Sequence, residues 1–335
     1  MKVLVTGGMG YIGSHTCLAL LNAGFEPIIY DNLTNSTTGV LQQLCRISNR
    51  KLTFVEGDIR DTDLLRQVMA QHGCEAVIHF AALKAVGEST EHPRRYYDNN
   101  VAGSLSLLSA MEDCGIRSIV FSSSATVYGD PDYIPIDESH PIRATNPYGW
   151  TKVMIEQVLK DTCAAQHEWQ AISLRYFNPV GAHESGLLGE NPLGTPNNLM
   201  PFIAQVAVRQ RDKLQVFGGD YPTPDGTGIR DYIHVMDLAV GHVRALQTKM
   251  GHTGFFAYNL GTGQGYSVLE MIHSFAKESG QTIPYVVSPR RNGDIPCSYA
   301  DPTLAQQALK WRAERNLPQM TADVWRWQSN YPSGI

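Results

Sequence analysis

The chain has 335 residues and a formal net charge of −5 at pH 7, which is typical of a soluble protein of about two domains. Its basic residues form no runs, so neither nucleic acid nor an anionic membrane surface is an expected partner. No apolar run approaches the roughly 18 residues that a membrane span needs. The six cysteines have no paired spacing, which favours reduced thiols in a cytoplasmic protein over a disulfide framework or a metal site.

The first predicted strand and helix enclose a glycine-rich turn. Residues 2–6 carry the apolar, β-branched run of a buried parallel strand, and residues 12–23 carry apolar side chains at helical spacing. In the turn, Gly7 permits a tight bend, Gly10 lets the backbone approach a pyrophosphate, and Gly13 lets the helix pack closely on the strand. The pattern predicts a bound dinucleotide whose pyrophosphate rests on the helix N-terminus.

The second predicted strand, residues 27–30, ends in an acidic residue. Asp31 follows Gly13 by 18 residues, and a carboxylate at this position holds the ribose hydroxyls of the adenosine. Because such a carboxylate repels a 2′-phosphate, the predicted cofactor is NAD rather than NADP. Asp58, which follows the third predicted strand, suits either a contact with the adenine or a loop cap.

Strands and helices alternate as far as residue 175, which is typical of a doubly wound α/β fold with a Rossmann-like parallel sheet. Further buried strands are predicted at residues 52–55, 76–80, 118–121 and 171–175. Long helices are predicted at residues 93–114 and from residue 147 onward. Ligands of such sheets bind beyond the carboxyl ends of the strands, so Ser124 and residues 178–181 are expected to face one cleft.

After residue 175 the chain has more loops rich in proline and glycine, and its helices are shorter. We interpret residues 1–175 as an NAD-binding Rossmann domain and residues 176–335 as a smaller α/β domain that binds the substrate. No flexible linker separates the two, so they are expected to pack tightly. The segments near residues 214–218 and 258–262 are candidates to return to the first domain.

The strongest sign of catalysis is the pair formed by Tyr148 and Lys152 at the start of the helix that begins with Pro147. Residues four apart share one face of a helix, so the ammonium is expected near the phenol. At roughly 5 Å and an effective dielectric of about 20, its attraction for a phenolate is about 3 kcal/mol, or about 2 pKa units. This predicts a tyrosine whose pKa is lowered towards working pH and which acts as a general base. The alternative interpretation is a core aromatic.

Several motifs together resemble the extended short-chain dehydrogenase/reductase family, and within it the UDP-hexose 4-epimerases. The motifs are residues 6–13, residues 124–129, Tyr148 with Lys152, and residues 175–179. The likeness covers essentially the whole chain and includes residues 84–89, 197–201, 231–235 and 289–291. The resemblance implies that Ser124 hydrogen-bonds the 4-oxygen of the sugar. It also implies that Tyr148 acts as base and acid, and that Lys152 binds the ribose of the nicotinamide.

The resemblance and the glycine motif together give two sets of expected contacts. Those of NAD are Gly7, Gly10, Tyr11, Ile12, Gly13, Asp31, Asn32, Asn35, Ser36, Asp58, Ile59, Phe80, Ala81, Ala82, Lys84, Asn99, Ser122, Tyr148, Lys152 and Tyr176. Those of the UDP-sugar are Lys84, Ser124, Tyr148, Phe177, Asn178, Asn198, Leu199, Gln215, Phe217, Arg230, Tyr232, Arg291, Asp294 and Ser298. By resemblance, the diphosphate is held by Asn178, Asn198, Arg230 and Arg291. Phe217 lies near the uracil and Asp294 contacts the uridine ribose.

The implied reaction inverts C4 of a UDP-hexose through a transient 4-keto sugar. In the family, the position of Cys297 and Ser298 holds either a bulky aromatic or a small residue near the sugar 2-position. The small side chain here predicts room for an N-acetyl group, and so turnover of UDP-GlcNAc and UDP-GalNAc as well as UDP-glucose and UDP-galactose. Relatives usually pair through the helices that correspond to residues 93–114 and 147–165, so a homodimer is expected.

Two other functions fit parts of the pattern. A sugar-nucleotide 4,6-dehydratase on the same scaffold needs an acid pair beside the active hydroxyl, and Ala125 and Thr126 stand there instead. A non-catalytic NAD-sensing protein would not need the tyrosine. The presence of Ser124, Tyr148 and Lys152 together argues against such a protein, although a serine at a strand end often merely satisfies backbone groups.

Overall fold

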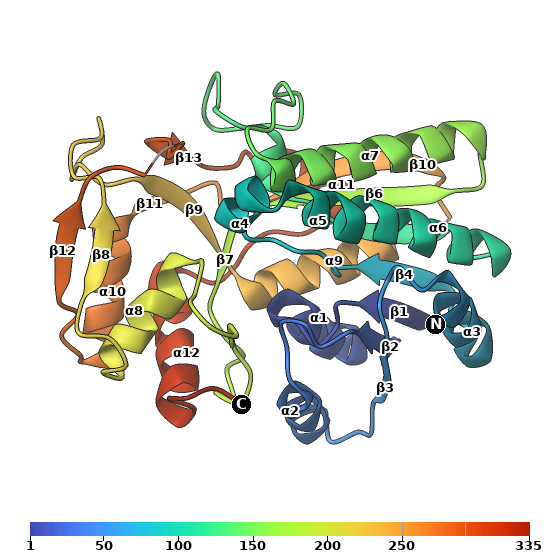
Figure 1. The fold of residues 1–335 in the computed structure, drawn as a ribbon, viewed down its shortest axis with the longest axis horizontal. Coiled ribbons are helices and arrows are strands. Elements are labelled where there is room, and N and C mark those ends of the chain that lie inside the picture. Colours follow the sequence, from blue (N-terminus) through green and yellow to red (C-terminus); the bar gives the residue numbers. More distant parts are fainter. Residues whose placement is uncertain (250, 292) are drawn as a thin grey trace.

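The protein is described by a computed structural model that covers residues 1–249, 251–291 and 293–335. Its centre is a sheet of seven parallel strands in the order β10-β6-β5-β4-β1-β2-β3 (Figure 1). The strands are β1 (Lys2–Thr6), β2 (Glu26–Asp31), β3 (Thr53–Glu56), β4 (Ala76–His79), β5 (Ser118–Ser122), β6 (Gln170–Tyr176) and β10 (Gly254–Leu260). The doubly wound parallel fold that the alternating pattern predicts is confirmed.

Both faces of this sheet are buried under helices. Successive residues of a strand point to opposite faces, so each strand contributes to two cores. In β1, Val3 and Val5 belong to the core on one face and Leu4 to the core on the other. The first face is covered by α1 (Tyr11–Asn22), α2 (Thr38–Ser48) and α9 (Val235–Lys249). The second is covered by α3 (Thr62–His72), α6 (Gly103–Asp113) and α7 (Pro147–Ala165). This burial on both sides explains why the strands read as continuous apolar runs.

The helix predicted at residues 93–114 is present without a gap from residue 93 to residue 113, but it contains a π-helical turn and is preceded by a separate short helix. The short helices α4 (Val86–Glu91) and α5 (Pro93–Tyr96) lead into a π-helical turn, η1 (Tyr97–Ala102), which continues as α6. In η1, Asn100 is fully buried, and its side-chain amide donates to the carbonyl of Leu83 at 3.0 Å while its oxygen accepts from the amide of that residue at 2.8 Å. The turn thereby fixes the loop after β4 at the carboxyl edge of the sheet.

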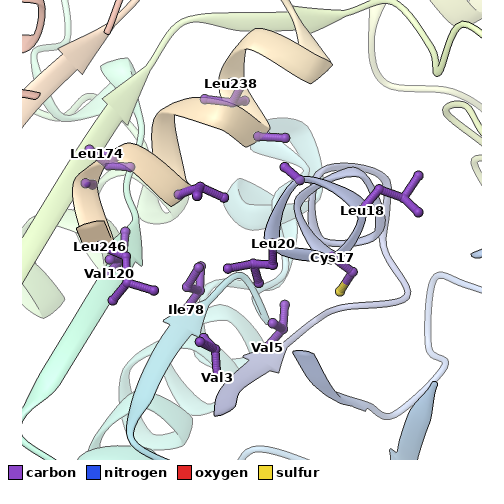
Figure 2. Packing of buried hydrophobic residues seen from close by; sticks show 14 of the residues in the cluster. Val3, Val5, Cys17, Leu18, Leu20, Ile78, Val120, Leu174, Leu238 and Leu246 are labelled. Atoms are coloured by element: carbon purple, nitrogen blue, oxygen red, sulfur yellow. The ribbon is translucent and has the colours of Figure 1, made fainter. Parts of the chain in front are cut away.

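Elements from late in the chain complete the central sheet. Strand β10 pairs along its whole length with β6 and forms one edge of the sheet, so the segment near residues 258–262 overlaps a strand of this layer. Figure 2 shows Leu238 and Leu246 of α9 in the same core as Val5 and Leu20. Helix α11 (Thr303–Leu309) adds Ala305 and Leu309 to that core. The chain therefore crosses the predicted boundary at residue 175 more than once.

The rest of the C-terminal part forms a second, smaller unit at the carboxyl end of the sheet (Figure 1). Strands β7 (Asn178–Val180), β9 (Ile229–His234), β11 (Gly265–Ser267) and β13 (Cys297–Ser298) form one sheet. Helices α8 (Leu199–Ala207), α10 (Val268–Ser279) and α12 (Leu317–Asn330) enclose a core of their own. Among the residues described, no helix combines the length and apolar character needed to cross a membrane.

The expectation that residues 214–218 return to the first sheet is wrong. Strand β8 (Leu214–Phe217) pairs in parallel with β12 (Tyr285–Ser288) in a separate two-stranded sheet. The physical reason is that Leu214 and Val216 point into the core around α8 and α10, where they are 3% and 1% exposed. The alternation of apolar and polar residues in this segment identifies a strand, but it does not identify the sheet to which the strand belongs.

Candidate active site

A cavity of about 560 Å³ opens at the carboxyl ends of the central strands and extends into the smaller unit. All the expected NAD contacts except Asp58 line it. Of the expected UDP-sugar contacts, those that line it are Lys84, Ser124, Tyr148, Phe177, Asn178, Asn198, Arg230, Asp294 and Ser298. One cavity therefore joins the glycine turn, the Tyr148 pair and the polar residues of the second unit.

The glycine turn between β1 and α1 fits closely against its surroundings. Gly7 has a φ of +69°, and a Cβ atom there would lie 2.6 Å from the amide nitrogen of Ala81. A Cβ on Gly13 would lie 2.2 Å from the carbonyl oxygen of Gly7. Gly10 stands at the N-cap of α1, and a glycine has no side chain to occupy the amides of the first helical turn. The turn leaves those amides available to an anionic group, as the sequence predicts.

Asp31 lines the cavity at the end of β2 and also organises the loop beyond it. Its Oδ2 accepts from the amide of Met9 at 3.0 Å, and its Oδ1 accepts from the amide of Leu33 at 2.9 Å and the hydroxyl of Ser36 at 3.1 Å. Burial raises the pKa of this carboxyl, and these hydrogen bonds act in the opposite direction. The carboxylate therefore joins the glycine turn to the loop that would surround an adenosine.

Asp58 lies outside this cavity, so the prediction of a direct adenine contact is not supported. Its carboxylate faces Arg60, with 2.9 Å between Oδ2 and Nη2, and the Arg60 hydrogen bonds lower its pKa. Asn32, which does line the cavity, donates to Asp58 Oδ2 at 3.1 Å. Asp58 thus acts on the cavity through Asn32.

Tyr148 and Lys152 stand in the first turns of α7, whose start is fixed by sequence. Pro147 occupies a position where a missing N–H costs nothing, and the Asn146 side chain caps the helix by accepting from the amide of Gly149 at 2.9 Å. Tyr148 is 9% exposed and Lys152 is 2% exposed. The Lys152 ammonium donates to the carbonyl of Ser122 at 2.7 Å and lies 5.8 Å from the centre of the Tyr148 ring.

The predicted lowering of the Tyr148 pKa is wrong for the protein on its own. Burial raises the pKa of Tyr148 to about 12, and a hydrogen bond with Ser124 acts in the opposite direction. Burial also lowers the pKa of Lys152 to about 7, although the charge of Glu156 acts against this. Both groups lose hydration on burial, which disfavours both charged forms and outweighs the attraction between an ammonium and a phenolate. In addition, the ammonium is bound to a backbone carbonyl rather than directed at the phenol oxygen.

Ser124 follows β5 and begins the 3₁₀ turn η2 (Ala125–Val127). Its Oγ accepts from the amide of Thr126 at 3.2 Å and from the hydroxyl of Thr126 at 3.0 Å. Ser124 is 9% exposed, and both residues line the cavity. The serine therefore satisfies a backbone group after the strand, as the simpler interpretation expects, and also lines the cavity in which the sugar oxygen is expected.

Some expected substrate contacts lie outside the cavity. Leu199 begins α8, Tyr232 is buried in the core of the second unit, and Gln215 and Phe217 stand on β8. The Arg291 guanidinium stacks on the Phe217 ring, with 3.8 Å between its central carbon and the ring centre. The geometry supports Arg291 and Phe217 as a pair, while Arg230 reaches the cavity beside Asp294, 3.9 Å from Nη2 to Oδ1.

The sequence interpretation missed several residues that line the cavity, notably Thr126 and Glu190. The Glu190 carboxylate accepts from the side chain of Asn198 at 2.9 Å and lies 3.6 Å from the Lys84 ammonium. Glu190 stands in an irregular loop, so no periodic pattern marks it. Thr126 could have been found by its place two residues after Ser124, where the dehydratase alternative requires an acid.

A doubly wound sheet, a glycine turn after its first strand, and a serine beside the Tyr148 and Lys152 pair define the class of short-chain dehydrogenases/reductases. Residues 4–324 match the family model described as GDP-mannose 4,6 dehydratase. The UDP-glucose 4-epimerase of Bacillus subtilis (strain 168) is 56% identical over 334 residues, which cover 100% of this chain and 98% of that protein. The chain belongs to the UDP-glucose 4-epimerase family.

Other relatives agree with this assignment. The UDP-glucose 4-epimerase of Yersinia pestis is 54% identical over 335 residues, which cover 100% of this chain and 99% of that protein. The crystal structure of the UDP-glucose 4-epimerase from Stenotrophomonas maltophila, with bound NAD and formylated UDP-arabinopyranose, has a TM-score of 0.97 at 50% identity, with 99% of both chains covered. The Bifidobacterium longum enzyme in complex with NAD+ and UDP also has a TM-score of 0.97 at 50% identity, with 100% of both chains covered.

Proposed function

We propose that this protein is an NAD-dependent epimerase that inverts C4 of UDP-glucose and UDP-galactose. The observation that carries the proposal is that Ser124, Tyr148 and Lys152 line the same cavity as the glycine turn and Asp31. Solved relatives with 50% identity hold NAD together with UDP or a UDP-sugar. A proton-transfer group thus stands in a cavity with a dinucleotide site at one end and polar side chains at the other.

The residues present fit NAD. The turn at Gly7 and Gly13 leaves no space for side chains, the amides of α1 are open to a pyrophosphate, and Asp31 is placed for ribose hydroxyls. When bound, NAD would take a hydride from C4 of the sugar and later return it to the opposite face. The chain's own task is then to move one proton and to hold the sugar nucleotide while the sugar turns.

Tyr148 carries the proton in this proposal. It accepts the proton of the sugar 4-hydroxyl as the hydride leaves, and it returns the proton when the 4-keto sugar is reduced. Because burial raises the pKa of Tyr148 to about 12 even with Ser124 acting in the opposite direction, formation of the phenolate depends on further positive charge in its surroundings. Ser124 supplies a hydrogen bond, and Lys152, held by the Ser122 carbonyl, supplies charge while it is protonated.

The second unit would hold the nucleotide part of the substrate. Asn178, Asn198 and Arg230 offer donors to a diphosphate, and a guanidinium suits such oxygens. Arg291 stacked on Phe217 offers a further cation and an aromatic face near the cavity. Anchoring by the diphosphate leaves the sugar free to present either face of C4 to the cofactor.

The finer proposal is that N-acetylated sugars are also accepted. Ser298 lines the cavity with a small side chain, as the sequence predicts. A Ser298→Tyr variant should therefore lose turnover of UDP-GalNAc at least tenfold more than turnover of UDP-galactose, because an added ring fills the space for the acetamido group. Equal losses for the two sugars would contradict this assignment of the subsite.

The oligomeric state is a further part of the proposal. Leu105 on α6 and Trp150 and Met154 on α7 are 47%, 41% and 41% exposed, so the two helices at which pairing is expected carry apolar side chains at their surface. A homodimer would cover these side chains. We also propose that the protein is cytoplasmic, because its cysteines suit reduced thiols. Light scattering of the purified protein should give about twice the mass of one chain, and a Trp150→Glu variant should shift it towards the monomer.

The decisive experiment is to incubate purified protein with UDP-galactose and UDP-GalNAc separately and to resolve the epimeric products. Formation of UDP-glucose and UDP-GlcNAc, with unchanged mass, is expected. A product lighter by one water would identify a dehydratase, which is not favoured because Ala125 and Thr126 stand where that reaction needs acids. Retention of NAD with no turnover of either sugar would identify an NAD-sensing protein.

A further inference from the structure

One residue fills both acceptor positions of the Ser124 hydroxyl. The amide and the hydroxyl of Thr126 both donate to Ser124 Oγ, at 3.2 Å and 3.0 Å. A serine hydroxyl accepts at most two hydrogen bonds and donates one. With both acceptor positions occupied, the Ser124 oxygen can take no further donor, and its own proton must go to a third partner.

We assign that proton to Tyr148, which lines the same cavity as Ser124. A hydrogen bond from Ser124 acts on the phenol and stabilises its ionised form, against the effect of burial. Both residues are 9% exposed and line the cavity where a sugar 4-oxygen would lie. A hydroxyl that can only donate favours a phenolate or an oxygen that is losing its proton, whereas a hydroxyl that also accepts would favour the neutral phenol.

We propose that Thr126 is a positioning residue that makes Ser124 a dedicated hydrogen-bond donor to the proton-transfer site. This inference rests on the proposed epimerase function, because it concerns the same proton. The amide of Thr126 alone would cap the 3₁₀ turn at Ser124, so the threonine hydroxyl is an addition that the backbone does not require. Without that hydroxyl, Ser124 Oγ regains a free acceptor position and can accept from the Tyr148 O–H.

The test compares Thr126→Val, which keeps the shape and removes the hydroxyl, with Thr126→Ser, which keeps the hydroxyl. With UDP-galactose as substrate, Thr126→Val is expected to lower kcat about tenfold, the effect of losing about 1.4 kcal/mol of transition-state stabilisation. KM should stay within about twofold, and the acidic limb of the kcat profile should move to higher pH, because the phenol is then harder to ionise. Thr126→Ser should restore kcat to within about threefold of the wild type.

A double-mutant cycle separates action through Ser124 from general damage. In a Ser124→Ala background, adding Thr126→Val should change kcat by less than about twofold, since the residue through which Thr126 acts is already gone. The inference is overturned if Thr126→Val leaves kcat within about twofold of the wild type. It is also overturned if Thr126→Ser loses as much activity as Thr126→Val, or if the two changes add in full. Inactive wild-type protein would instead reject the proposed function.

Discussion

Glu156 and Arg175 form a buried ion pair, with 2.6 Å between Oε2 and Nη2 and 8% of each side chain exposed. Glu156 lies one helical turn beyond Lys152 on α7, and its charge acts to raise the pKa of Lys152. The remaining capacity of its Oε1 is used by the hydroxyls of Ser123 and Ser173, each at 2.6 Å. The buried polar groups next to the active-site lysine are thus joined in one hydrogen-bonded network.

Removing the charge of Glu156 should destabilise the fold. In Glu156→Gln the Arg175 guanidinium stays buried without a counterion, which is expected to cost about 3 kcal/mol of the free energy of unfolding. Glu168→Gln is the matched control, because Glu168 pairs with Arg117 at 3.6 Å and is 61% exposed, and such pairs contribute little. Urea unfolding of both variants checks this, and similar unfolding midpoints would contradict it.

Lys152 should make stability depend on pH in a defined direction. Because burial lowers its pKa from 10.5 to about 7, the unfolded chain holds more protons on this group than the folded protein between those values. The contribution of Lys152 to the free energy of unfolding therefore rises with pH through that window. Below pH 7 the lysine is charged in both states, and the cost of burying that charge is then at its full value. Between pH 7 and 9 the free energy of unfolding of the wild type should rise relative to that of Lys152→Met by at most about 2 kcal/mol. Parallel urea-unfolding profiles of the two proteins would contradict the buried, neutralised lysine.

Replacing Tyr148 by phenylalanine should abolish most turnover while the fold persists. Loss of a general base lowers kcat by about 10²- to 10⁴-fold, and the phenol oxygen contributes little else to packing. Tyr285→Phe is a suitable control, because Tyr285 is 42% exposed on β12 and is not among the residues that line the cavity. Product formation from UDP-galactose is the measurement, and a Tyr148→Phe variant with normal kcat would reject Tyr148 as the base.

Glu190 should weaken the binding of anionic ligands. It places a carboxylate in a cavity proposed for a diphosphate. The same carboxylate pairs with the Lys84 ammonium and accepts a hydrogen bond from Asn198, so these two groups are less available to a ligand. Glu190→Gln keeps an acceptor for Asn198 and frees the Lys84 charge, so UDP should bind about fivefold more tightly, or by about 1 kcal/mol. Titration calorimetry with UDP checks this against Glu184→Gln, which removes the same charge from an exposed position of the same loop. Weaker binding by Glu190→Gln would show that Glu190 serves the ligand.

Local patterns predict those parts of the site in which one short segment supplies the whole geometry. The turn at Gly7 to Gly13, the carboxylate at the end of β2, and the helix start at Pro147 each depend on neighbours in the sequence, and the structure brings these three segments to one cavity. Long-range features escaped prediction. The partner of β8 depends on which core takes Leu214 and Val216, and the pKa of Tyr148 depends on burial by several elements, neither of which periodicity encodes.

Strand β10 and helix α9 have a consequence for how the chain reaches its native state during synthesis. Until residues 235–260 have left the ribosome, β6 has an open edge, and the apolar surface around Leu174 and Val120 lacks its cover from Leu238 and Leu246. The nucleotide-binding half therefore cannot complete its sheet as an autonomous folding unit from residues 1–175 alone. While the edge of β6 is open, the unpaired strand and the apolar surface beside it are exposed to aggregation.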